Sequence, residues 1–195
     1  KPFLYALRNL MGSHDRPRIL NVLAGNDGSD IPRDQRAHHR LSPEERMIGA
    51  LREQLMLRFI FSVPGMPCIY YGDEAGMEGC ADPFCRRTYP WGHEDAQMLA
   101  RYQAMTAMRN AHPVLRTGEC VYLAPCADVL GVIRKNESGR DAFGSQAENA
   151  CAVTLINRSA KEVVVYLTAE DVCGAKTLVT DDGQTLSARG GAFSV

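Results

Sequence analysis

Two short predicted strands on either side of one predicted helix restrict the fold of this chain most strongly. Residues 5–11 are apolar enough for a strand buried on at least one face, and residues 68–71 form a second apolar run. Residues 43–61 between them carry the pattern of a helix. A strand, a helix and a second strand form a βαβ unit, whose strands are parallel neighbours in one sheet. This part of the chain therefore belongs to the α/β class.

The helix over 43–61 is predicted from both of its ends and from its apolar stripe. Ser42 and Glu45 occupy the two positions of a capping box, Pro43 stands at the first helical position, and Pro64 closes the segment. Apolar residues recur about every four positions, which predicts one buried face. The residues expected on that face are Met47, Ile48, Leu51, Leu55, Met56 and Phe59.

A second helix is predicted over residues 96–110, with Asp95 as its cap and a methionine-rich face. After residue 117 the pattern changes to short β-rich runs separated by turn residues, which is typical of an antiparallel sandwich. The runs are 121–123, 129–134, 150–157, 163–167, 177–179 and 192–195. We therefore predict two domains, residues 1–116 and residues 117–195.

Composition restricts the partners of the chain. The formal net charge of −1 gives no electrostatic reason to expect nucleic acid or an anionic membrane. The longest strongly apolar stretch, residues 55–67, is interrupted by Arg58 and is too short to span a bilayer. Seven cysteines without CxxC pairs suggest mostly free thiols in a reducing compartment, so a cytoplasmic location is expected. The chain begins at Lys1, which leaves the natural N-terminus open.

No metal and no cofactor are predicted. Asn26, Asp27 and Asp30 lie in one loop but lack the ligand spacing and the closing glutamate of a calcium loop. Cys80 and Cys85 have no nearby histidine spacing that would favour zinc.

Two blocks carry a family resemblance. The first is NLMGSHDRPR, residues 9–18, and the second is PGMPCIYYGDE, residues 64–74, which continues through the loop to residue 92. They resemble the α-amylase family of retaining glycoside hydrolases, nearest the neopullulanase, cyclomaltodextrinase and maltogenic amylase group. The blocks look like the segment after barrel strand seven and like barrel strand eight with its long loop. The β-rich tail is similar to the C-terminal sandwich of the family.

The resemblance implies a (β/α)8 TIM barrel of which this chain holds only strands seven and eight, followed by a β-sandwich. Two strands cannot close such a barrel. We therefore expect the chain to be the C-terminal portion of a longer retaining α-glucan hydrolase, inactive alone, whose nucleophile and general acid lie upstream. The implied substrate is an α-glucan oligosaccharide, and the implied reaction cleaves α-glucosidic bonds in maltodextrins, cyclodextrins or pullulan.

The resemblance assigns roles to four residues. Asp15 matches the third family carboxylate, which binds hydroxyls of the sugar being cleaved and stabilises the transition state. His14 matches a histidine that donates a hydrogen bond to the same sugar, and Asp82 and Arg86 match residues lining donor-side subsites. From the residues alone, Asp15 would be a turn residue, His14 a structural residue, and Asp82 and Arg86 a surface salt bridge.

Other conspicuous residues are expected to be mainly structural. The adjacent carboxylates Asp73 and Glu74 are expected to be structural, and Tyr70 and Tyr71 to pack. Trp91 is either a sugar-stacking platform or a buried anchor of its loop. The cluster over residues 36–40, RAHHR, is most simply a solvated face.

Two questions stay open at this level. The alternative to a hydrolase is a non-catalytic amylase-like module with a binding or structural role, and the retention of His14 and Asp15 favours the enzyme. The second question is the oligomeric state. Relatives in this subgroup often dimerise through an N-terminal domain, so the full-length protein could be a homodimer.

Overall fold

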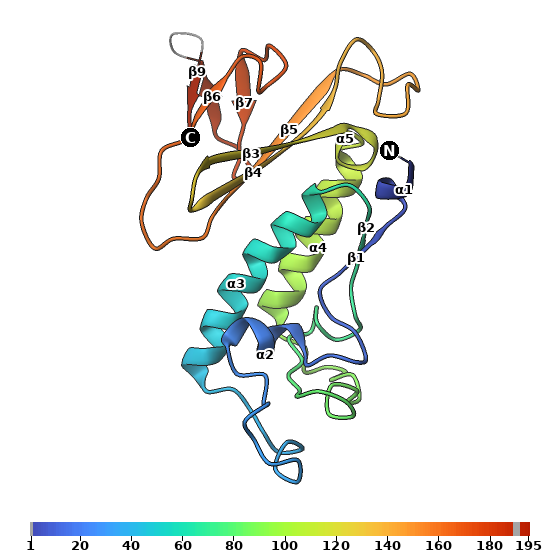
Figure 1. Ribbon diagram of the computed structural model, residues 1–195, viewed down its shortest axis with the longest axis vertical. Coiled ribbons are helices and arrows are strands. Elements are labelled where there is room, and N and C mark those ends of the chain that lie inside the picture. The colour runs from blue at the N-terminus through green and yellow to red at the C-terminus, as the bar shows by residue number, and fades with distance from the viewer. Residues whose placement is uncertain (1, 189–191) are drawn as a thin grey trace. The chain divides into compact units, whose positions relative to one another are not determined.

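The computed structural model describes residues 2–188 and 192–195, and the chain divides into two compact units (Figure 1). The helical unit comprises Ala6–Phe61 and Gly65–Ala111. The β-rich unit comprises Ser62–Pro64 and His112–Val195, together with the first residues of the chain. Each unit is described by itself. The chain is a mixed α/β protein.

The helical unit contains the predicted parallel strand pair. Strand β1 (Arg8–Leu10) pairs with β2 (Met66–Cys68) in parallel, and Arg8 lies opposite Met66. Both strands are shorter than expected, since the prediction ran over 5–11 and 68–71. Residues 69–71 already belong to the loop after β2, and Pro67 within β2 has no N–H to donate.

Three helices accompany these strands: α2 (Ile19–Ala24), α3 (Pro43–Ser62) and α4 (Ala96–Ala111). Helix α2 was not predicted. The capping box is confirmed, because the Ser42 amide donates to Glu45 Oε2 at 2.7 Å and the Glu45 amide donates to Ser42 Oγ at 3.2 Å. Asp95 also caps α4 as predicted, since Oδ1 accepts the Met98 amide at 3.0 Å.

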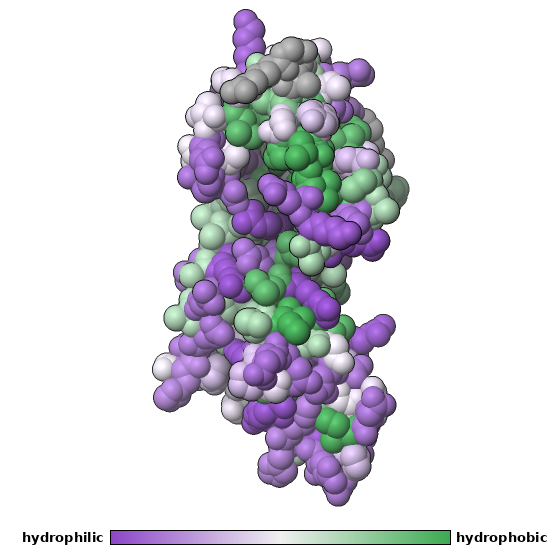
Figure 2. Space-filling model, turned by 90° about the vertical axis from the view of Figure 1, so that its left-hand side faces the viewer, coloured by the Kyte–Doolittle hydropathy of each residue, from purple (hydrophilic) through white to green (hydrophobic). Residues whose placement is uncertain are grey.

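The predicted buried face of α3 is wrong. The structure leaves Met47, Ile48, Leu51 and Met56 exposed, and α3 instead packs through a face that includes Gly49, Glu53, Leu57 and Ile60. Apolar residues surround nearly the whole circumference of α3, so their spacing could not single out one face. Figure 2, which looks onto the side where α3 lies, shows apolar residues set among charged ones.

The core of the helical unit lies between α2, α3 and α4. Helices α3 and α4 run side by side (Figure 1), and Leu57, Ile60 and Phe61 of α3 pack against Met98 and Tyr102 of α4. The methionine-rich face predicted for α4 is therefore confirmed as core. At Gly49 a β-carbon would stand 2.8 Å from the carbonyl oxygen of Leu20, so only glycine allows α2 to approach α3 this closely.

One carboxyl group is buried within this core. Glu53 is fully buried, and its Oε1 accepts a hydrogen bond of 2.5 Å from the Tyr102 hydroxyl, whereas its Oε2 has no partner in the described structure. Burial raises the pKa of Glu53 to about 7, against the opposing effects of the Tyr102 hydroxyl, Arg46 and Arg101.

The β-rich unit begins with two helical turns, α1 (Pro2–Tyr5) and α5 (Val114–Thr117), and continues as antiparallel strands. Strands β3 (Glu119–Cys126), β4 (Val129–Asn136) and β5 (Ala150–Asn157) form one sheet with β4 in the middle. Strand β6 (Tyr166–Thr168) pairs with β9 (Ala192–Ser194), and β7 (Thr177–Val179) pairs with β8 (Thr185–Ser187). The prediction missed only β8 among these strands.

The β-rich unit has an apolar core and a buried cation. Val129 of β4 packs with Leu167 of β6 and Phe193 of β9. Arg134 is fully buried, and it donates to the carbonyl oxygens of Ser62, Leu115 and Gly118. The guanidinium thus satisfies three main-chain acceptors where the chain enters the sheet.

Three further properties concern the described part of the chain. All seven cysteines are free thiols. No group of three or more His, Cys, Asp or Glu side chains within residues 2–188 and 192–195 is arranged to hold a metal ion. No helix in those residues has both the length and the apolar character needed to cross a membrane.

The buried Glu53 predicts an unusual pH dependence of stability. A carboxyl whose pKa is higher in the folded state stabilises the fold below its unfolded pKa, and this contribution is lost as the pH rises through about 7. Between pH 5 and pH 8 we expect wild type to lose about 2 kcal/mol of unfolding free energy relative to Glu53→Gln. Urea unfolding, followed by helical ellipticity at both pH values, measures the difference. Parallel pH profiles for the two proteins would contradict the assignment.

Candidate active site

The two parallel strands direct two loops to the same edge of the sheet. Because β1 and β2 are parallel, the segment after β1 and the loop after β2 both leave from the carboxyl ends of the strands. Gly12 lies where they meet: a β-carbon there would stand 2.3 Å from Asp73 Oδ2. The glycine of the Gly-Ser-His-Asp sequence therefore permits the close approach that brings residues 13–15 beside the second loop.

Arg18 holds the two loops together. Its side chain is fully buried and forms an ion pair of 3.0 Å with Asp73 Oδ1. The same guanidinium donates to the carbonyl oxygens of Tyr71 and Cys85, and it lies over the Tyr70 and Tyr71 rings at 4.4 and 4.7 Å from their centroids. Arg18 thus fixes three points of the loop after β2 against the segment after β1.

Sequence analysis missed this residue. Arg18 directly precedes the apolar run ILNVL, so a burial argument could have singled it out, but nothing local indicates its partners. Its carboxylate partner Asp73 is 2% exposed, and burial raises the pKa of Asp73 to about 6 although the ion pair with Arg18 opposes that shift.

The structure brings together all four residues that sequence analysis selected. His14 and Asp15 lie exposed in the segment after β1, with His14 Nε2 3.2 Å from Asp15 Oδ1. Asp82 and Arg86 lie in the loop after β2, with Arg86 Nε 2.6 Å from Asp82 Oδ1. The second contact of Arg86 joins the two pairs, because its Nη2 lies 3.7 Å from Asp15 Oδ1.

The main chain at His14 is fixed by the same loop. Its carbonyl oxygen accepts hydrogen bonds from the Cys85 thiol at 3.1 Å and from Arg86 Nε at 3.2 Å. The Asp15 amide donates to Ser13 Oγ at 3.3 Å. These contacts hold the backbone of the segment while the Asp15 carboxylate remains open to solvent. An open carboxylate between an imidazole and a guanidinium is suited to accept hydrogen bonds from hydroxyl groups of a ligand.

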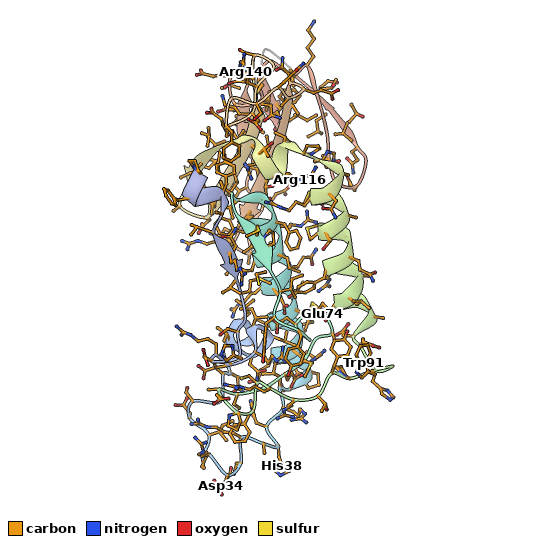
Figure 3. All side chains as sticks on the ribbon, turned by 90° about the vertical axis from the view of Figure 1, so that its right-hand side faces the viewer. Asp34, His38, Glu74, Trp91, Arg116 and Arg140 are labelled. Carbon is orange, nitrogen blue, oxygen red and sulfur yellow. The ribbon has the colours of Figure 1, made fainter. Side chains whose placement is uncertain are left out.

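The remaining conspicuous residues have mainly structural contacts. Glu74 Oε2 accepts the Gly72 amide at 2.9 Å, as expected for a carboxylate that satisfies loop backbone. The Tyr71 hydroxyl donates to the Arg87 carbonyl oxygen at 2.7 Å. Trp91 is 80% exposed and contacts the Tyr89 ring at a centroid distance of 4.5 Å, which removes the buried-anchor alternative. Figure 3 shows Trp91 projecting from its loop.

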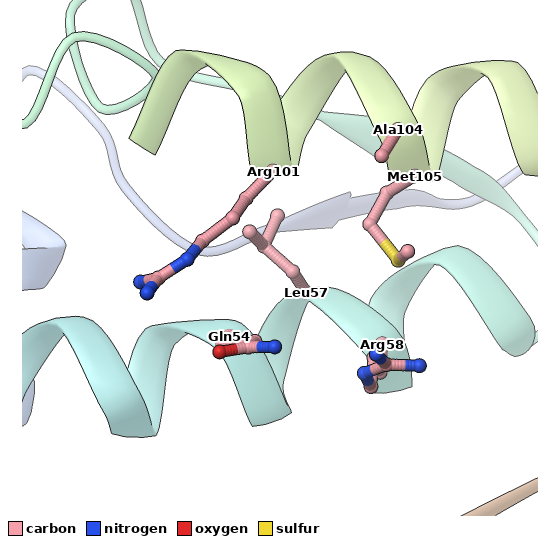
Figure 4. Close-up of a pocket in the computed structure, with 6 residues that line it drawn as sticks. All are labelled: Gln54, Leu57, Arg58, Arg101, Ala104 and Met105. Carbon is pink, nitrogen blue, oxygen red and sulfur yellow. The ribbon is translucent and has the colours of Figure 1, made fainter. Parts of the chain in front are cut away.

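A small pocket between the two long helices contains none of these residues. It has a volume of about 120 Å³ and lies between α3 and α4 (Figure 4). Its lining residues are Gln54, Leu57, Arg58, Arg101, Ala104 and Met105. The candidate active site itself is an open surface at the sheet edge.

Two relatives match nearly the whole of this chain. The chain is 34% identical to an amylopullulanase of Thermoanaerobacter thermohydrosulfuricus over 192 residues, which cover 94% of this chain and 12% of that protein. It is 28% identical to a maltogenic α-amylase of Bacillus acidopullulyticus over 197 residues, which cover 96% of this chain and 28% of that protein. This chain belongs to the α-amylase family of glycoside hydrolases.

The structural comparison supports the same α-amylase fold. A solved Anoxybacillus α-amylase superposes with a TM-score of 0.74 at 22% identity, over 98% of this chain and 35% of that one. No protein-family model matches the chain. The α-amylase-family segment described here thus spans about an eighth to a third of the length of these relatives.

The Arg18–Asp73 pair gives a testable prediction for stability. Arg18→Met leaves a buried carboxyl without its charge partner, and we expect it to lower the unfolding free energy by about 3–5 kcal/mol. The double variant Arg18→Met/Asp73→Asn removes both charges and should recover at least about 1 kcal/mol. Urea unfolding followed by helical ellipticity measures both.

The matched control is Arg16→Met, which removes an exposed arginine from the same segment. We expect this control to stay within about 0.5 kcal/mol of wild type. An Arg18→Met variant as stable as the control would show that the buried pair does not hold the loops.

Proposed function

We propose that this chain is the part of a retaining α-glucan hydrolase that supplies the last two strands of its barrel and the sandwich domain that follows. In this assignment β1 is barrel strand seven, β2 is barrel strand eight, and the β-rich unit is the C-terminal sandwich. Strands β1 and β2 are parallel, and helix α3 lies between them along the chain. This order supports the barrel assignment. The names of the amylopullulanase and maltogenic α-amylase relatives support the substrate class.

One observation carries the proposal. His14, Asp15, Asp82 and Arg86 come from two separate loops and meet at the carboxyl edge of the parallel strands. The carboxyl edge is where TIM-barrel enzymes place their active sites. A purely structural role would not require an exposed carboxylate, imidazole and guanidinium to converge at that edge.

In the proposed mechanism Asp15 stabilises the transition state. Retaining glycosidases use two carboxyl groups about 5–5.5 Å apart, one as nucleophile and one as general acid, and the longer protein supplies both. Asp15 accepts hydrogen bonds from hydroxyls of the sugar being cleaved, and these strengthen as the ring distorts towards the oxocarbenium-like state. His14 donates to the same sugar, and Arg86 keeps positive charge beside the carboxylate.

The flanking residues would bind neighbouring sugars. Asp82 and Arg86 line a donor-side subsite, and the exposed Tyr89–Trp91 pair offers an aromatic surface for the apolar face of a sugar. The substrates are α-glucosidic bonds in maltodextrins, cyclodextrins or pullulan.

The role of Asp15 is tested in the longer enzyme that carries this segment. Asp15→Asn keeps the size of the side chain but removes its charge, and we expect kcat on maltodextrin to fall by about 10²–10³-fold. The thermal midpoint should stay unchanged, because the Asp15 side chain is 69% exposed.

Asp34→Asn is the matched control, since Asp34 is an exposed carboxylate near the tip of the loop that precedes α3 (Figure 3). We expect it to leave kcat unchanged. Near-normal turnover in Asp15→Asn would reject the assigned role. A longer protein that binds maltodextrin without hydrolysing it would favour the non-catalytic module.

A separate prediction concerns the chain by itself. Because the nucleophile and general acid are assigned to the longer protein, the 195-residue chain should release no reducing sugar from maltodextrin, cyclodextrin or pullulan above the blank. The longer enzyme, assayed at the same molar concentration, is the positive control. Measurable hydrolysis by the 195-residue chain would overturn the division of catalytic residues proposed here.

A further inference from the structure

An open polar pocket of about 590 Å³ lies in the helical unit, separate from the candidate active site. None of His14, Asp15, Asp82 and Arg86 lines it. Its wall is formed by residues of three segments: the end of the loop before α3, the first turn of α3, and the long loop before α4. The lining residues are Arg40, Arg46, Ala75, Gly76, Met77, Glu78, Arg87, Thr88, Pro90, His93 and Asp95.

Both carboxylates of this pocket are already engaged. Arg46 forms ion pairs with Glu78 at 2.6 Å and with Asp95 at 2.9 Å. Glu78 also accepts the Leu41 amide at 2.9 Å, and Asp95 caps α4 through the Met98 amide. Arg46, Glu78 and Asp95 therefore form an ionic group with one more negative than positive charge, and with Arg40 and Arg87 the pocket lining carries a net formal charge of +1.

The other two arginines have no carboxylate partner within the described part of the chain. Arg40 Nη1 donates to the His39 carbonyl oxygen at 2.7 Å, and Arg87 donates to the carbonyl oxygens of Ala37 and Phe84. Each guanidinium therefore keeps N–H groups that no carbonyl accepts. Both arginines line the same pocket. Burial lowers the pKa of Arg87, repulsion from Arg40 lowers it further, and attraction to Glu78 opposes the shift.

We propose that this pocket binds a phosphate group through Arg40 and Arg87, with the Thr88 hydroxyl as a third donor. Two guanidinium groups that share a concave site match the charge and the donor geometry that a phosphate oxyanion needs. The phosphate comes either from inorganic phosphate or from a phosphorylated sugar, and the pocket volume admits both. His93 and Pro90 stand at the same wall to contact a sugar ring.

The test is isothermal titration of the 195-residue chain with inorganic phosphate at low ionic strength. We expect saturable binding to one site. Arg87→Gln should weaken the affinity about ten-fold or more, since it removes a charge-assisted donor pair. Arg33→Gln removes an exposed arginine from the loop before α3 but outside the pocket, and should change the affinity less than about two-fold.

A second set of titrations separates the two sources of phosphate. Glucose 6-phosphate binding about ten-fold tighter than inorganic phosphate, with no binding of glucose, supports a sugar phosphate as ligand. Equal affinities for glucose 6-phosphate and inorganic phosphate support free phosphate.

Absence of saturable phosphate binding overturns the proposal, as does equal weakening by Arg87→Gln and Arg33→Gln, which would indicate diffuse attraction to the surface. Circular dichroism of each variant excludes unfolding as the cause of a loss. The titration does not involve glucan hydrolysis, so its outcome is independent of the function proposed for Asp15.

Discussion

The geometry of the candidate site depends on one buried cation. Arg18 reaches the loop after β2 at Tyr71, Asp73 and Cys85, and so fixes that loop against the segment that carries His14. The loop also fixes that segment, because Cys85 and Arg86 donate hydrogen bonds to the His14 carbonyl oxygen. Without these contacts the exposed site residues would sample many relative positions, because fixing a flexible segment costs conformational entropy. The buried contacts of Arg18 therefore keep the exposed site residues in place.

The features that could be predicted from the sequence are those set by near neighbours in the chain. The capping box at Ser42 and Glu45 and the cap at Asp95 follow from local pattern, and the structure confirms both. The parallel strand pair follows instead from the order of strand, helix and strand along the chain, and it is also confirmed. The four site residues were selected by resemblance, and the structure brings them together while leaving their roles as proposals. Their grouping follows from strand direction, which is itself a consequence of the βαβ order.

The features that could not be predicted depend on contacts between distant residues. Arg18 and Asp73 are separated by 55 positions, and neither has a local pattern that identifies the other. The prediction of the buried face of α3 was wrong for a different reason. A helix that is apolar nearly all round has no periodic pattern that indicates which face is covered. The pairing of Glu53 with Tyr102 across α3 and α4 likewise appears only when the two helices are packed together.

The exposed apolar face of α3 has a consequence for the chain in solution. Met47, Ile48 and Leu51 expose hydrophobic side chains on one side of the helix, and Met56 is exposed farther along it. Contact between these side chains and water is unfavourable. With a net charge of only −1 the chain has little electrostatic repulsion to keep copies apart. This face therefore adds to the tendency of copies of the chain to associate, which higher concentration and added kosmotropic salt increase.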